Sequence, residues 1–256
     1  MKKICSLLLA MALLLSLNVT VFAAENDQVQ QMSIDEYCSS ENFSLEGLKE
    51  LFPDYYSRCQ EEYAQDKAMI EKINSNLDDL LEEGRNIALT DAKATEVVTQ
   101  SNARGATLGT YGDILVSLNI DSGSSGFAGH AAIVSSSAYY TIESYAKSFS
   151  PINADGVQIY SNTWRTRSGA LLVRPHNAHS SQYSTAAAFA SGKVGLPYNW
   201  NFFNKTTTDK YYCSQLVWQA WLSAGINTET GSIPNGIIAP ADLVNSSNTY
   251  VVTHIT

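Results

Sequence analysis

One cysteine of the chain, Cys213, stands where a nucleophilic thiol is commonly placed. Apolar residues recur at helical spacing directly after it, at Leu216, Ala220 and Ala224, and Gly225 follows where a helix-ending glycine is expected. A thiol in the first turn of that helix faces unpaired backbone N–H groups and the positive end of the helix dipole, which favour the thiolate. The alternative is that Cys213 is a small buried side chain that packs in the core and has no catalytic role.

A thiol nucleophile needs a base, and the base needs a group that orients it. The chain has four histidines, His130, His176, His179 and His254. The last three are expected in a loop and near the end of the chain. His130 differs because it opens an apolar strand directly after a glycine-rich loop. It is therefore the candidate base, with a satisfied core histidine as the alternative.

The strand that follows the His130 strand offers the orienting group. If Ser136 and Ser137 form a two-residue turn, the two strands run antiparallel and His130 lies directly opposite Glu143. Directly opposed residues point to the same face, with Cβ atoms about 5 Å apart. A carboxylate at that distance fixes the tautomer and orientation of an imidazole. Serines are not preferred turn residues, and a three-residue loop would break this register.

The elements that position these residues belong to an α+β pattern. Short strands are predicted at 113–118, 130–134, 139–143, 157–160, 170–173 and 250–255. A helix is predicted over 180–191, and the cysteine helix follows, with Thr208 and Asp209 upstream of it as expected caps. We expect one cysteine-bearing helix packed on a mostly antiparallel sheet.

The preceding region reads as helices. Ser33 and Glu36 have capping-box spacing, a short helix starts at Ser44 and is ended by Pro53, and apolar residues recur at helical spacing over 55–81. Gly84 is expected to interrupt this pattern. Residues 88–98 are predicted as one further helix, and residues 101–110 as a linker.

The charge is unevenly distributed between these two regions. Residues 24–103 hold eighteen acidic and six basic side chains, a net charge of −12, whereas residues 104–256 hold seven acidic and eight basic ones, a net charge of +1. We therefore expect an acidic helical region over 24–102 and a separate domain over 103–256. No basic cluster is available to neutralise phosphates, which argues against nucleic acid as a partner.

Residues 1–23 have the pattern of a secretory signal peptide: a basic start at Lys2 and Lys3, an apolar run, and small residues at a cleavage site. No later run is long and apolar enough to span a bilayer. We expect a secreted, soluble protein. In that compartment Cys38 and Cys59 are predicted to form a disulfide between helices, with two free buried thiols as the alternative. No metal-binding spacing occurs, so no metal or cofactor is expected.

Five segments occur in an order that resembles a known family: 111–115, 129–134, 142–144, 195–198 and 212–218. They are similar to circularly permuted papain-like cysteine hydrolases of the YiiX, YaeF and YebB type, which are permuted relatives of the NlpC cell-wall peptidases. In papain-like enzymes the cysteine helix precedes the histidine strand, and here that order is reversed. The segment 240–243 is also similar, and the resemblance covers roughly residues 105–256.

The resemblance implies that Cys213 is the nucleophile, His130 the base and Glu143 the third polar member of a catalytic unit. Tyr198 and Tyr111 are candidates for a further oxyanion donor or for a wall of the cleft. Tyr212 belongs to the aromatic residues expected around the site, for which plain core packing is the alternative.

The resemblance implies two possible functions, and a third of a different class stays open. A signal peptide and kinship with NlpC imply hydrolysis of amide bonds in cell-wall peptides. Similarity of the permuted group to lecithin:retinol acyltransferase-like proteins implies a lipid esterase or acyltransferase instead. A non-catalytic binding protein could keep the same fold and use the acidic helices as its contact surface. In an enzyme, that region would be a lid, a wall-binding element or a pro-segment.

Overall fold

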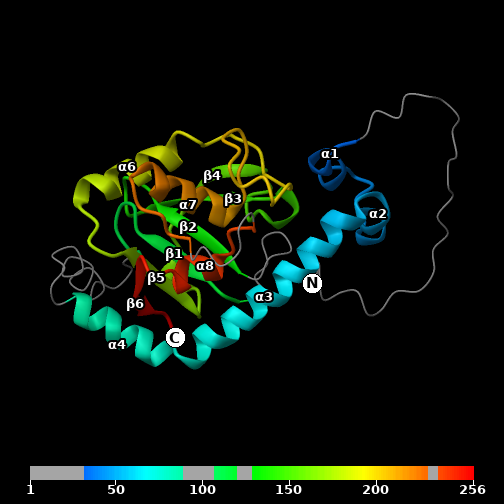
Figure 1. Cartoon of the computed structure of the whole chain (residues 1–256). Coiled ribbons are helices and arrows are strands. Elements are labelled where there is room, and N and C mark those ends of the chain that lie inside the picture. The colour runs from blue at the N-terminus through cyan, green and yellow to red at the C-terminus, as the bar shows by residue number, and fades with distance from the viewer. Residues whose placement is uncertain (1–31, 89–106, 120–128, 230–235) are drawn as a thin grey trace, which may run out of the picture.

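A six-stranded antiparallel sheet lies at the centre of the computed structural model, which describes residues 32–88, 107–119, 129–229 and 236–256 (Figure 1). Its strand order is β4-β3-β2-β1-β5-β6, and every neighbouring pair is antiparallel. The strands are β1 (Ile114–Ser117), β2 (His130–Val134), β3 (Tyr140–Tyr145), β4 (Gly156–Ser161), β5 (Ala170–Pro175) and β6 (Thr249–His254). The predicted α+β class is confirmed.

Both faces of the central strands are covered, which explains their almost continuous apolar sequence. Ile114 and Val116 point into a large apolar cluster shared with the helices. Leu115 and Ala132 point to the opposite face, into a smaller cluster around the buried Trp164. The strand β2 that His130 begins is buried along its whole length. The sheet therefore gives His130 a rigid support.

Two helices cover the face of the large cluster and contact each other, α6 (Ser180–Ser191) and α7 (Cys213–Ser223). The predicted end of α7 is confirmed. Gly225 has a φ of 85°, and its N–H and that of Ile226 donate to the carbonyls of Leu222 and Trp221, both at 3.0 Å. These paired bonds satisfy the last carbonyls of the helix, and only glycine adopts that backbone conformation readily.

The predicted N-terminal caps of α7 are wrong. Tyr212 precedes the helix directly, and its N–H donates to the side-chain Oε1 of Gln215 at 3.1 Å. Asp209 instead accepts a hydrogen bond from Thr207 within the upstream loop. The side chain of Gln215 thus satisfies the N–H of the residue before the helix, and Cys213 is the first helical residue.

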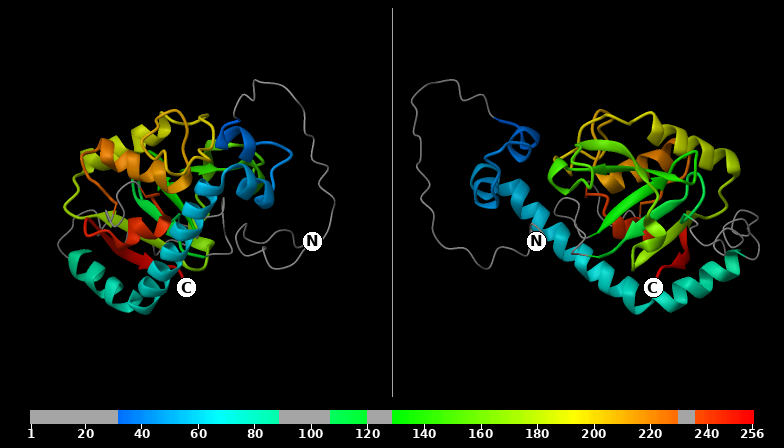
Figure 2. Two further views of the ribbon diagram at one scale, coloured as in Figure 1. Left: turned by 45° about the vertical axis from the view of Figure 1, so that its right-hand side comes forward. Right: turned by 180° about the vertical axis from the view of Figure 1, so that it is seen from behind.

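The N-terminal region forms α1 (Ile34–Cys38), α2 (Leu45–Leu51), α3 (Pro53–Ser75) and α4 (Leu77–Ala88), which run along one side of the sheet domain (Figures 1 and 2). The capping box is confirmed, because Ser33 and Glu36 exchange hydrogen bonds of 2.7 and 3.2 Å. Pro53 starts α3 rather than only ending α2. A proline suits a first helical turn because its missing N–H would have no partner there.

Gly84 does not interrupt the helical pattern but lies inside α4, where the helix crosses β6. A Cβ atom at this position would lie 1.7 Å from the carbonyl oxygen of Val251. The missing side chain therefore lets the helix approach the strand closely. The predicted helix over 88–98 lies outside the described residues except for its first position, and residues 101–106 of the predicted linker also lie outside them.

The acidic region shares one apolar cluster with the sheet domain, since Tyr37 and Ile73 belong to the same cluster as Ile114 and Trp221. Residues 1–31, which include the predicted signal peptide, and the predicted domain boundary at 102/103 lie outside the described residues. Among the described residues, no helix is long and apolar enough to cross a membrane.

Polar contacts add to this attachment. Asp35 accepts hydrogen bonds from the backbone N–H of Trp200 at 2.9 Å and of Asn201 at 3.3 Å, and it pairs with Lys210 at 2.7 Å. The hydroxyl of Tyr55 donates to the carbonyl of Trp200. The first helices therefore hold the loop that leads directly into the cysteine helix.

The predicted disulfide between Cys38 and Cys59 is not formed, and both thiols are free. Burial raises the pKa of each thiol to about 12. Cys38 packs in the apolar cluster, and the thiol of Cys59 is hydrogen-bonded to Tyr55. The prediction depended on the expected export of the protein; in the structure both side chains pack in the same apolar cluster without a bond between their sulfur atoms.

We predict that Gly84→Ala destabilises the protein, although alanine usually favours a helix by about 1 kcal/mol. The added methyl group would overlap the backbone of Val251, so we expect a loss of about 1–3 kcal/mol in the free energy of unfolding. Urea denaturation followed by circular dichroism measures this change.

The matched control is Gly192→Ala. Gly192 has helical backbone angles, and its Cβ would meet only ordinary contacts of 3.4 and 3.5 Å. We expect this control to change the free energy of unfolding by no more than about 0.5 kcal/mol. Equal effects of the two substitutions would contradict the close approach of α4 to β6.

Candidate active site

The structure brings Cys213, His130 and Glu143 together in its interior. Cys213 is the first residue of α7, His130 the first of β2, and Glu143 lies within β3. Their exposed fractions are 0%, 2% and 0%. The helix α7 contacts both strands, as their positions in Figure 1 indicate.

The imidazole of His130 is hydrogen-bonded on both sides. Its Nε2 lies 2.8 Å from Oε2 of Glu143, and the ring also forms a hydrogen bond with the thiol of Cys213. An ionised carboxylate can only accept, so Nε2 carries a hydrogen and donates it. Nδ1 is then the nitrogen left for the thiol. The result is a continuous chain from thiol to imidazole to carboxylate.

The predicted hairpin register is wrong, although the predicted contact forms. The observed pairs are Ile133 with Ile142 and Val134 with Thr141, and residues 136–139 connect the strands. Continued outward, this register places His130 opposite Tyr145 rather than Glu143. The error is two residues, and side chains two apart on a strand share a face. Glu143 therefore reaches the imidazole diagonally instead of from directly across.

The carboxylate of Glu143 is the centre of a buried polar cluster. It accepts hydrogen bonds from Tyr145 at 3.0 Å, from the indole N–H of Trp164 at 3.1 Å, and from the hydroxyl of Thr141. The guanidinium of Arg167 lies 3.8 Å away. Burial raises the pKa of this carboxyl, but the hydrogen bonds and positive charges around it lower the value to about 2. It is therefore ionised at neutral pH.

Two aromatic rings hold the imidazole of His130 in place. Tyr145 stacks on it with ring centres 4.1 Å apart, and Trp164 lies nearly parallel to it at 5.9 Å. Burial lowers the pKa of His130, whereas its hydrogen bonds with Cys213 and Glu143 raise it, with a net value of about 8. The imidazole is thus fixed in orientation and ready to carry a proton.

The same contacts act on the thiol of Cys213. Burial raises its pKa, but the hydrogen bond and charge of His130, the backbone of Ala131 and the hydroxyl of Ser214 together lower it below the ordinary value of 9.0. A lowered thiol pKa beside a raised histidine pKa favours the thiolate–imidazolium pair. The thiolate is the nucleophilic form of a cysteine, so this pairing is suited to nucleophilic chemistry.

The three predicted substrate-binding tyrosines lie in different surroundings. Tyr212 is fully buried, and its hydroxyl accepts the N–H of Ile238 at 3.0 Å, which ties the start of α7 to residues 236–239. Tyr198 is almost fully buried and packs against Trp200. Tyr111 lines a hollow with Ser136 and Ser184 that does not include the three central residues. Their roles toward a substrate stay predictions.

The other histidines lie elsewhere. His176 packs against Tyr250, His179 precedes α6, and His254 ends β6. Within the described residues, no group of three or more His, Cys, Asp or Glu side chains could hold a metal ion.

Sequence reasoning missed Thr141, Tyr145, Trp164 and Arg167. The alternation of Thr141, Glu143 and Tyr145 along one strand was a usable signal, because residues two apart share a face. A tryptophan and two arginines within 164–167 were a second signal. Trp164–Thr166 form a short 3-10 turn between β4 and β5, and Arg167 follows it directly. The distance in sequence between β3 and that turn concealed their contact.

A cysteine helix packed on an antiparallel sheet, with the histidine strand earlier in the chain than the helix, is the arrangement of a permuted papain-like hydrolase. Residues 114–252 match the family described as permuted papain-like amidase enzymes, YaeF/YiiX, C92 family. This match covers more than half of the chain, and the chain belongs to that family. The predicted resemblance is confirmed.

One curated relative is the uncharacterized protein YycO of Bacillus subtilis (strain 168). It is 33% identical to this chain over 109 residues, which are 41% of this chain and 43% of that protein. The similarity thus spans less than half the length of the relative. No solved structure matches the chain.

We predict that iodoacetamide modifies Cys213 rapidly below pH 9.0, the ordinary pKa of a cysteine thiol, because the pKa of Cys213 is lowered. His130→Ala removes the hydrogen bond and the charge that lower the pKa of the Cys213 thiol. Burial, which raises this pKa, remains. In the His130→Ala protein, the rate at which Cys213 is modified should therefore be low at neutral pH and rise only in alkaline solution. Mass spectrometry of the modified peptide measures the rate.

Glu143→Gln should slow this modification less than His130→Ala, because it keeps an acceptor for Nε2 but loses the negative charge that stabilises the imidazolium. His176→Ala is the matched control, since His176 packs against Tyr250 and not against the thiol. A control as slow as His130→Ala would refute the assignment of His130.

Proposed function

We propose that this protein is a secreted cysteine hydrolase that cleaves amide bonds in cell-wall peptides through a thioester on Cys213. Membership of the permuted papain-like amidases gives the general class. The observation that carries the proposal is the hydrogen-bonded chain from Cys213 through His130 to Glu143, at the N-terminus of a helix. This is the arrangement that activates a thiol nucleophile.

The first half of the reaction forms the thioester. His130 takes the thiol proton on the nitrogen that does not face Glu143, and the sulfur of Cys213 attacks the carbonyl carbon of the substrate. The resulting oxyanion is held by the backbone N–H of Cys213, at the positive end of α7, and by a second donor. The C–N bond then breaks, and the imidazolium gives its proton to the leaving amine.

The second half regenerates the enzyme. His130 takes a proton from water, and the hydroxide formed attacks the thioester carbonyl. The C–S bond breaks, the carboxylic acid product leaves, and the imidazolium returns its proton to the sulfur of Cys213. No oxidant, reductant or metal is needed for either half.

Glu143 and the rings around His130 act by positioning. The carboxylate is ionised and holds the hydrogen on Nε2, so the opposite nitrogen can accept the thiol proton. It also stabilises the positive charge that the imidazole gains. Tyr145 and Trp164 restrict rotation of the ring and keep it in line with the sulfur.

The choice of cell-wall peptides is supported by the family's amidase description and by the signal-peptide pattern of residues 1–23. An exported hydrolase meets the cell wall on leaving the cell. A lipid esterase would use the same thioester chemistry on an ester carbonyl. The substrate test therefore has to include both bond types.

We predict that the full-length protein releases peptides from purified peptidoglycan fragments and leaves phospholipid vesicles intact, as followed by mass spectrometry. Cys213→Ala and His130→Ala should each lower the rate by about 10³-fold or more, because each removes a member of a unit that acts together. Release of fatty acid from the vesicles would instead support the lipid esterase.

Cys59→Ala is the matched control for these substitutions. Its thiol is half-buried and has a raised pKa, so it should not take part in the reaction. We expect its hydrolysis rate to equal that of the parent protein. Undiminished hydrolysis by Cys213→Ala would refute the proposed mechanism.

A further inference from the structure

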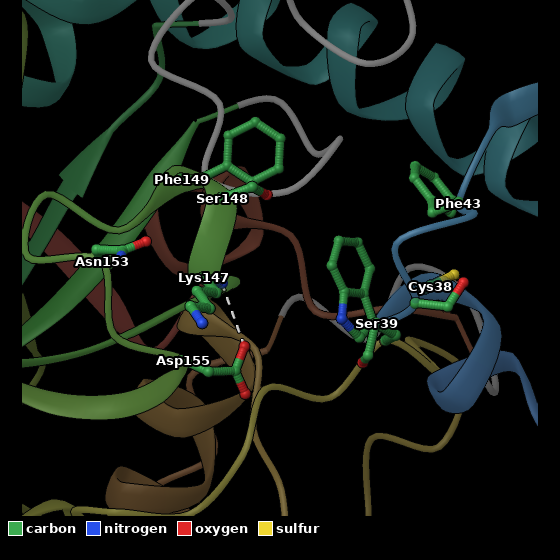
Figure 3. A pocket seen from close by; sticks show the side chains of 10 residues that line it. Cys38, Ser39, Phe43, Lys147, Ser148, Phe149, Asn153 and Asp155 are labelled. Carbon is green, nitrogen blue, oxygen red and sulfur yellow. Dashed lines mark hydrogen bonds between the residues drawn. The ribbon is translucent and has the colours of Figure 1, made fainter.

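A cavity of about 530 Å³ lies between the N-terminal helices and the connection from β3 to β4. Its size is within the range of small-ligand sites. Figure 3 shows Lys147, Phe149 and Asp155 on one side of it, and Phe43 and Ser39 on the other. The two sides come from segments more than a hundred residues apart in the chain. The acidic region and the hydrolase domain therefore build this cavity together.

The lining of the cavity does not include Cys213, His130 or Glu143, but two lining residues, Lys147 and Trp200, are linked to neighbours of these residues. Lys147 follows two residues after Tyr145, whose ring stacks on the imidazole of His130 at 4.1 Å. Trp200 lines the cavity and packs against Phe202, whose ring lies 5.5 Å from that of Tyr212. Tyr212 directly precedes Cys213. One wall of the cavity is thus linked through the chain to the ring that stacks on the imidazole, and another wall is linked through packed rings to the residue before Cys213.

Hydrogen bonds fix the frame of the cavity. The carboxylate of Asp155 accepts the backbone N–H of Lys147 at 3.2 Å and that of Tyr198 at 3.1 Å. On the opposite side Asp35 accepts the N–H of Trp200, and the rings of Phe43 and Trp200 lie 6.1 Å apart. The cavity is therefore formed before a ligand arrives, which lowers the entropic cost of binding.

The lining combines apolar rings with one exposed cation and one carboxylate. Phe43, Phe149 and Trp200 provide aromatic surface. The side chain of Lys147 is exposed, and no carboxylate of the described residues lies within ion-pair distance of its ammonium group. Both carboxylate oxygens of Asp155 already accept backbone hydrogen bonds. The lining therefore carries one charge of each sign. The carboxylate of Asp155 is held by two backbone N–H groups, whereas the exposed ammonium group of Lys147 can pair with an anionic group that lies beside an apolar one.

We propose that this cavity binds an acidic part of the peptide substrate, with a carboxylate on Lys147 and an apolar side chain against Phe43, Phe149 and Trp200. The proposal rests on the proposed peptide hydrolase function and names the substrate class of that site. It gives the N-terminal helices a role in substrate binding, because Phe43 comes from the connection between α1 and α2.

The test measures binding in full-length Cys213→Ala, which cannot form the thioester. The probes are two tripeptides, Ala-Glu-Leu and Ala-Gln-Leu, acetylated at one end and amidated at the other, so that only the first carries a carboxylate. Calorimetry should give a dissociation constant about three- to tenfold lower for the glutamate peptide, as expected for one partly exposed charge pair.

Substitutions of Lys147 identify the source of the difference. In the Cys213→Ala protein, Lys147→Met should make the two affinities equal, and Lys147→Glu should reverse their order. Phe43→Ser should weaken both peptides alike, because it removes apolar surface and no charge. Lys67→Met is the matched control: Lys67 is exposed on α3 and does not line the cavity, so the preference should persist.

The inference is refuted if neither peptide binds, if the parent binds both equally, or if the preference survives Lys147→Met. These results are separate from the proposed function, because binding is measured without turnover. Peptidoglycan cleavage that depends on Cys213 but shows no effect of Lys147→Met on the Michaelis constant would keep the hydrolase and reject this cavity.

Discussion

The buried carboxylate of Glu143 is the constraint on which the site depends. Burying a carboxylate costs several kcal/mol unless its oxygens are hydrogen-bonded and its charge is balanced. Here His130, Thr141, Tyr145 and Trp164 bond to it, and Arg167 lies nearby. The strands β2 and β3 and the turn after β4 must therefore keep their relative positions. The same requirement fixes the imidazole and, through it, the thiol.

The N-terminal helices, which lie outside the sheet, also help to hold the segment that carries Cys213 in place. Asp35 and Tyr55 bind the backbone around Trp200, and that loop leads into Cys213. The acidic region has a different charge from the sheet domain but not a separate apolar core. The acidic side chains of this region lie mostly on the outer surface of its helices, and the apolar side chains of the same helices pack in the shared core. The uneven charge therefore does not mark a separate folding unit.

The sequence predicts elements better than it predicts their contacts. The α6 boundaries, the start of β2 and the glycine stop of α7 follow from local patterns, and all are observed. The hairpin register fails because it depends on the conformation of a serine loop, and the His130–Glu143 contact forms because the error preserves the face of the strand. The Cys38–Cys59 bridge and the role of Gly84 depend on distances between elements, which no local pattern contains.

The contact between Gly84 and Val251 has a consequence for the order of events on the ribosome. The helix α4 emerges early, but the strand that it crosses, β6, is synthesised more than 160 residues later. The cysteine helix and the loop that α1 holds also emerge late. The apolar face of the N-terminal helices therefore stays exposed until the later elements have been synthesised. Contacts between residues so distant in sequence also form slowly. A nascent chain thus carries the strand of His130 before the helix of Cys213 has been made, and the contact between these two residues forms only after that helix has packed on the sheet.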